Sequence, residues 1–148
     1  MIGSFRSVRL AVLSAVIAVG LLSATSGFAA DAHTTSKFEG VKANSGTVKH
    51  SRDAGKDMLT WSDDYKIPDT PAPHWQVVDT KGNVYLLQQQ RIKGEKQNRT
   101  IAVPSYVKDI AKVQVWCSFA EALLGEALFP APLKTAAADR DDMMLSSR

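Results

Sequence analysis

Cys117, the only cysteine among 148 residues, is the residue with the clearest chemical potential. It lies inside 113–129, the most apolar run after the N-terminal segment. A thiolate can act as a nucleophile, a redox group or a ligand, but its formation needs a nearby cation or a helix N-terminus. Strand alternation places Cys117 with Val113 and Val115, where no such neighbour is visible and burial raises the pKa of a thiol. An inert buried thiol and a redox thiol or ligand therefore both remain open.

Two histidines are candidate metal ligands, His74 and His33. His74 follows a proline-rich loop and precedes Trp75. If it met Cys117, thiolate and imidazole together would suit copper or haem, the two cofactors that we consider. Neither His74 nor the remaining histidine, His50, has ligand-like spacing to another donor, so a solvent-exposed or hydrogen-bonded histidine is the simpler interpretation of both.

The N-terminus has the order of a secretory signal peptide, which we assign to residues 1–30. Arg6 and Arg9 precede the apolar run 10–22, and small residues follow over 23–32. The apolar run is too short to span a membrane, so we expect no membrane span in the mature protein. We therefore predict a periplasmic or secreted protein.

The place of cleavage decides the chemistry of His33. A cut after Ala30 would expose Asp31-Ala32-His33, whose amine, two amide nitrogens and imidazole could surround a square-planar copper(II) or nickel(II) ion. A cut after Ala32 would make His33 the terminus, with amine and imidazole as a two-atom clamp. The alternative is a disordered terminus without a ligand.

The charge of the chain argues against nucleic acid as a partner. The formal net charge is +3, and without Arg6 and Arg9 the 18 basic residues become 16 against 15 acidic ones, or +1. These charges are mixed along the chain, whereas binding to a phosphate backbone needs cations clustered on one face.

Short β-favouring stretches separated by turn signals predict an all-β fold, an antiparallel β-sandwich over residues 31–129. The clearest hairpin joins 74–78 and 84–87 through the turn 79–83, and a loop with three prolines precedes it. Pro130 and Pro132 should end regular structure, which leaves 130–148 as a flexible tail. The indications for residues 119–129 conflict, because their composition favours a helix while the preceding strands need a partner strand.

The order of several short motifs resembles the DM-thirteen domain, a small extracytoplasmic module found beside cytochrome-like DOMON domains and in stand-alone bacterial proteins. The resemblance spans about 38–129, and its sharpest part is Trp-Cys-x-Phe followed by Gly-x-Ala. Its residues are Phe38-Glu39-Gly40, Gly46-Thr47-Val48, 58–61, 73–78, Pro104, Val115-Trp116-Cys117, Phe119, Gly125, Ala127 and Leu128.

This resemblance implies a β-sandwich with strand and bend over 119–129. It also implies electron transfer centred on Cys117, acting as a bare thiol or by holding a prosthetic group such as haem. The chain departs from the pattern at Glu121 and Leu124, and no DOMON or haem domain is attached. Any electron donor would therefore be a separate redox protein partner.

Together these features predict an exported accessory module that works in electron transfer or redox chemistry through Cys117. One alternative is a non-catalytic binding or envelope-interaction module, in which the cysteine is structural and a sandwich face or the loop 63–74 contacts a protein or glycan. Another is copper binding at the N-terminus. The sequence contains no complete catalytic constellation, which argues against an enzyme.

Overall fold

The computed structural model describes residues 31–93, 96–97 and 99–147. The predicted signal peptide and its cleavage sites before Asp31 lie outside these residues. The strands are β1 (Val48–Asp53), β2 (Lys56–Trp61), β3 (Pro73–Val78), β4 (Val84–Gln89), β5 (Ile92–Lys93), β6 (Lys96–Gln97), β7 (Thr100–Ala102), β8 (Asp109–Cys117) and β9 (Ala122–Lys134), and one helix follows, α1 (Ala136–Ser146).

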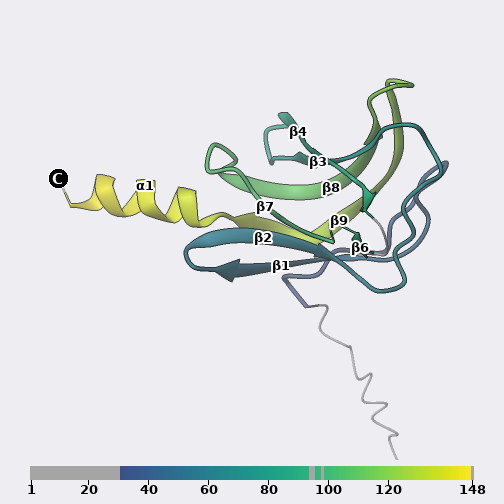
Figure 1. The fold of residues 1–148 in the computed structure, drawn as a ribbon. Helices are drawn as coiled ribbons and strands as arrows, with labels where there is room; N and C mark the ends of the chain where they lie inside the picture. Colours follow the sequence, from purple (N-terminus) through teal and green to yellow (C-terminus); the bar gives the residue numbers. More distant parts are fainter. Residues whose placement is uncertain (1–30, 94–95, 98, 148) are drawn as a thin grey trace, which may run out of the picture.

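The strands form two antiparallel sheets that pack against each other, as the sequence predicted (Figure 1). One sheet has the order β1-β2-β7 and the other β4-β3-β8-β9, while β5 and β6 pair as a small hairpin. The predicted hairpin around 79–83 is confirmed as β3 and β4. The fold is therefore an all-β sandwich.

Alternation along the strands builds the core between the sheets. On β2 the inward residues are Asp57, Leu59 and Trp61, and on β8 the valines Val113 and Val115 are fully buried. Trp61 and Trp75 stack at the centre with ring centroids 4.6 Å apart and planes 9° from parallel. Burial of such large apolar surfaces is the main force that holds the two sheets together.

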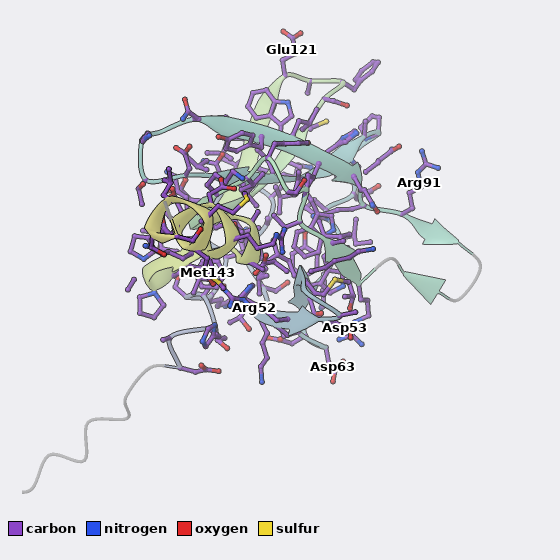
Figure 2. All side chains as sticks on the ribbon, turned by 90° about the vertical axis from the view of Figure 1, so that its left-hand side faces the viewer. Arg52, Asp53, Asp63, Arg91, Glu121 and Met143 are labelled. Atoms are coloured by element: carbon purple, nitrogen blue, oxygen red, sulfur yellow. The ribbon has the colours of Figure 1, made fainter. Side chains whose placement is uncertain are left out.

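Residues 119–129 form a turn and then most of β9, so the strand implied by the family resemblance is confirmed over the helix favoured by composition. A β-bulge between Val115 and Trp116 inserts one residue into β9. The tight turn before β9 places Glu121 at a positive φ of 48°. Glu121 projects from the outer end of this turn (Figure 2).

Residues 39–43 cover the outer edge of β9. Glu39 and Glu126 exchange two backbone hydrogen bonds of 2.9 Å, and Ala43 N donates to Leu124 O. A Cβ on Gly40 would lie 2.3 Å from Gly125 Cα, and a Cβ on Gly125 would lie 2.5 Å from Ala43 O. The Phe-Glu-Gly and Gly-x-Ala motifs thus meet at a backbone contact that leaves no room for a side chain.

The prediction that regular structure ends at Pro130 was wrong. β9 continues to Lys134, because both prolines lie between Leu128 and Leu133, where the pairing with β8 shifts register and needs no ladder donor from them. The helix α1 follows and extends away from the sandwich (Figure 1), with Met143 near its outer end (Figure 2). Among the described residues, no helix is long and apolar enough to cross a membrane.

Among the described residues, three ion pairs join α1, in the segment predicted as a flexible tail, to the rest of the fold. They join Arg52 to Asp139 at 2.7 Å, Lys108 to Asp141 at 2.8 Å and Lys134 to Asp142 at 3.2 Å. The N-cap residue Thr135 is buried and donates its hydroxyl to Val107 O at 2.9 Å. The acidic residues of α1 therefore face basic residues from three separate strands and loops.

Candidate functional site around Cys117

Cys117 is the last residue of β8 and its sulfur faces the core. It pairs with Pro73 of β3 on one side and with Ala122 of β9 on the other. Like Val113 and Val115 it has an exposed fraction of 0%. The predicted position on the valine face is confirmed.

The sequence predicted that burial would raise the pKa of Cys117, but the surroundings of the sulfur in the structure lower it. The backbone N–H of Ala120 hydrogen-bonds toward the sulfur and is the largest cause of a lowered pKa of Cys117. Burial opposes this effect, and the N–H groups of Ala72 and Phe119 and the hydroxyl of Thr70 add to it. The thiolate is therefore stabilised by dipoles, without a cation or a helix N-terminus.

Two short segments supply these donors. The turn after β8 brings in Ala120 and Phe119, and the proline-rich loop before β3 brings in Thr70 and Ala72. Ser118 N donates to Ala72 O at 3.0 Å and ties the two segments together. Backbone donors carry no residue signature, which is why sequence reasoning missed them.

Thr70 contributes to the surroundings of the sulfur and also lines a surface hollow. Its hydroxyl oxygen is buried and has no geometric hydrogen-bond partner among the described residues. A surface hollow of about 370 Å³ lies over this loop, and its lining residues are Ile67, Pro68, Asp69, Thr70, Pro71, Pro73, Gln89 and Gln90. Thr70 thus stands between the sulfur and a hollow at the surface.

The structure does not bring His74 to Cys117. The ladder pairs His74 with Trp116 and Pro73 with Cys117, so strand alternation sends the two side chains to opposite faces of the sheet. His74 Nδ1 lies 2.9 Å from Ala72 O. His74 therefore does not complete a copper or haem site with the cysteine.

The sulfur also lacks space for a prosthetic group. It is fully buried under the loop that carries Thr70 and Ala72, so a haem iron has no approach to it. In the part of the chain that the structure describes, no three His, Cys, Asp or Glu side chains gather closely enough to hold a metal ion. The residues around Cys117 fit a bare thiol and do not fit a haem or copper ligand.

His33 lies far along the sandwich from this site, beside His50, which sequence reasoning did not pair with it. The Nδ1 atoms of the two imidazoles are 3.0 Å apart. His50 Nε2 lies 2.9 Å from Oδ1 of Asp57, and both side chains are almost completely buried. Asp57 was missed because its inward position on β2 appears only once the strand register is known.

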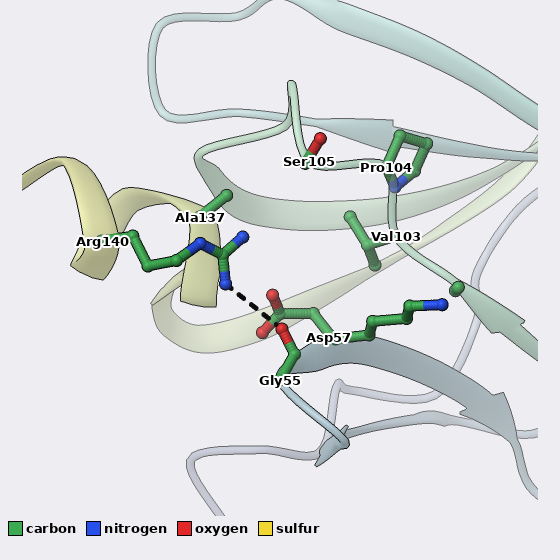
Figure 3. Close-up of a pocket in the computed structure, with 9 residues that line it drawn as sticks. Gly55, Asp57, Val103, Pro104, Ser105, Ala137 and Arg140 are labelled. Carbon is green, nitrogen blue, oxygen red and sulfur yellow. Dashed lines mark hydrogen bonds between the residues drawn. The ribbon is translucent and has the colours of Figure 1, made fainter.

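A hollow between β2, the 102–105 segment and α1 has Asp57 at its base (Figure 3). Arg140 NH1 donates to Gly55 O across it at 3.3 Å. The second oxygen of Asp57 accepts a 2.8 Å hydrogen bond from Ala136 N. Asp57 and Arg140 are thus used to dock α1, and Lys56 and Ser105 also line the hollow.

The outer face of the larger sheet combines a polar row with apolar borders. Gln76 donates to Gln114 at 2.6 Å, Gln114 donates to Glu126 at 2.9 Å, and Lys112 pairs with Glu126 at 2.8 Å. These contacts lower the pKa of Glu126, with Lys112 as the largest cause. The apolar side chains that border the row and are 40–56% exposed are Val84, Leu86, Leu123 and Leu128.

Comparison of the chain with models of known families, with curated proteins and with solved structures finds no match. The resemblance to the DM-thirteen domain therefore stays a prediction.

Proposed function

We propose that the protein is an exported accessory redox module that uses Cys117 as a bare thiol. The arrangement that carries this proposal is the fully buried Cys117 sulfur beneath two segments that the 3.0 Å hydrogen bond from Ser118 N to Ala72 O ties together, where the N–H of Ala120 is the first cause of a lowered pKa. An inert core cysteine has no need of converging donors, and its burial alone would favour the protonated form. Donors arranged toward a sulfur favour the thiolate, which is the reactive species.

The chemistry that fits a lone thiolate is exchange with disulfides of partner proteins. Cys117 attacks one sulfur of a partner's disulfide, that bond breaks, and the other sulfur leaves as a thiolate. A dithiol protein then attacks the Cys117 sulfur of the mixed disulfide and releases the reduced first partner. Its second thiolate completes its own disulfide and restores the Cys117 thiolate, so two electrons pass from the dithiol protein to the first partner.

Access to the sulfur requires the proline-rich loop to move. Thr70 and Ala72 lie on this loop, and Ser118 is tied to it by one backbone hydrogen bond. Local opening of such a loop costs less free energy than unfolding of the sandwich. The hollow over residues 67–73 is the place where a redox partner would dock.

The rate at which Cys117 is alkylated under native conditions tests this function. We expect iodoacetamide to modify it faster than the whole protein unfolds, and Pro71→Gly to increase the rate because it loosens the loop. Pro132→Gly, at an exposed proline on β9, is the matched control and should leave the rate unchanged. A thiol that reacts only at the rate of global unfolding would refute the redox role.

The second candidate is a non-catalytic binding module with a structural cysteine. The exposed apolar borders on the outer face of the larger sheet favour it, because that face has its polar groups already paired. Leu123→Asp together with Leu128→Asp should then abolish capture of an envelope partner, while Cys117→Ser leaves it intact. Loss of capture in Cys117→Ser at unchanged stability would contradict this second function.

A further inference from the structure

The histidine pair at the other end of the sandwich is independent of the proposed redox function. His50 belongs to β1, and His33 lies on the segment that enters the sheet beside it. His50 N donates to His33 O at 2.7 Å, and Thr34 forms a β-bridge with Lys49. The backbone therefore fixes the two imidazoles side by side, with their Nδ1 atoms 3.0 Å apart and their ring planes 22° from parallel.

Asp57 sets the tautomer of His50. A carboxylate only accepts hydrogen bonds, so the proton of the 2.9 Å contact lies on His50 Nε2. Asp57 is itself held by Ala136 N, at 2.8 Å, through its other oxygen. Neutral His50 consequently presents a bare Nδ1 lone pair toward His33. A carboxylate behind the far nitrogen is the usual outer partner of a histidine that binds a metal ion.

We propose that His33 and His50 bind one divalent transition-metal ion through their Nδ1 atoms, with copper(II) held most tightly. Nitrogens about 2.0–2.1 Å from one ion lie roughly 2.9 Å apart in adjacent square-planar positions and about 3.4 Å apart in a tetrahedron. The observed 3.0 Å falls within this range, so a rotation of the exposed His33 ring is the main adjustment needed. Imidazole is a preferred ligand of copper, nickel and zinc.

The charged groups around the His33–His50 pair allow a cation to bind there. Arg52, which lines the hollow beside the pair, is already paired with Asp139 at 2.7 Å and with Asp57 at 3.4 Å. The carboxylate of Asp31 accepts a 3.0 Å hydrogen bond from His33 N. A surface hollow lined by His33, His50, Ser51 and Arg52 opens beside the pair. Water can therefore supply the remaining ligands.

This site differs from the N-terminal copper motif predicted from the sequence. That motif needs a free amine at Asp31 and no contribution from His50. The proposed pair needs His50 and no free amine. The full chain of residues 1–148, in which a peptide bond precedes Asp31, separates the two.

Copper(II) titration of the full chain, followed by calorimetry and by electron paramagnetic resonance, tests the pair. We expect one equivalent to bind with nitrogen coupling in the spectrum, and at least tenfold weaker binding in both His33→Ala and His50→Gln. The glutamine variant keeps a donor toward Asp57, and His33→Ala removes an exposed side chain, so at least one variant folds. His74→Ala is the control and should bind as the unaltered chain does. Equal affinity in His33→Ala, or weakening in His33→Ala but not in a folded His50→Gln, would overturn the proposal.

Discussion

The sulfur of Cys117 and the His33–His50–Asp57 row are two polar centres of the same sandwich, built by different means. Main-chain N–H groups and one hydroxyl surround the sulfur, which is sealed from solvent. The row consists of side chains and leads from the buried Asp57 to the exposed His33. The first centre is thus a property of the backbone path, and the second is a property of residue identity. Substitutions should affect them in different ways.

The largest effect should come from the backbone contact that holds the cysteine strand. Gly125 pairs with Val115, and an added Cβ would lie 2.5 Å from Ala43 O. Gly125→Ala should therefore lower the free energy of unfolding by about 3 kcal/mol, measured in urea, because the crossing segments must separate. Gly82→Ala, where φ is 84° but no atom lies within 4 Å, should cost only about 1 kcal/mol. Equal losses would show that the close contact at Gly125 costs no more than the positive φ at Gly82.

In the His33–His50–Asp57 row, the exchange of a single atom should change the stability of the protein. Asp57→Asn keeps an acceptor for His50 but turns an NH₂ group toward Ala136 N, whose donor then has no partner. We expect a loss of about 2 kcal/mol in urea unfolding, since a buried unsatisfied donor costs about 1–3 kcal/mol. Asp53→Asn, at an exposed position on β1, is the matched control and should change stability by less than about 0.5 kcal/mol. If Asp57→Asn left the free energy of unfolding unchanged, α1 would dock without the hydrogen bond from Ala136 N.

The same contrast explains what the sequence could predict. Alternation over Val113, Val115 and Cys117 gave the correct face, and the turn 79–83 gave the correct hairpin. The donors around the sulfur were not predictable, because Ala120 and Ala72 contribute main-chain atoms from segments that meet only in the fold.

The errors near the C-terminus have a related cause. Pro130 and Pro132 were interpreted as terminators, yet a register shift in β9 removes the need for their N–H groups. Residues 130–148 were predicted as a flexible tail, although Arg52 and Lys108 lie opposite the acidic side chains of α1 in the fold. Likewise His33 and His50 meet only because a short bridge aligns the N-terminal segment with β1. Local patterns therefore predicted strands and faces, and they could not predict which strands meet.

A smaller effect should appear in the pH dependence of stability. The pKa of Cys117 is lowered in the folded protein, so folding favours the thiolate. The resulting stabilisation is complete above the usual thiol pKa of 9.0 and is lost as the pH falls through the folded pKa. The stability of the protein relative to Cys117→Ala should therefore rise with pH in the range just below 9.0. Urea unfolding at several pH values under reducing conditions measures this, and a difference that is flat or falls with pH would contradict it.

The smallest effect should come from the Thr70 hydroxyl, the one side-chain contribution to the lowered pKa of Cys117. Thr70→Val keeps the shape and removes the hydroxyl, so the midpoint of thiolate absorbance should move to higher pH. Thr70→Ser keeps the hydroxyl and should retain the lower midpoint. Because the hydroxyl oxygen is buried without a hydrogen-bond partner, Thr70→Val should not lower the free energy of unfolding. An unchanged midpoint would mean that the backbone donors, led by Ala120, cause the whole decrease in the pKa of Cys117. The Cys117 centre would then be built by the backbone alone, and the His33–His50–Asp57 row by side chains.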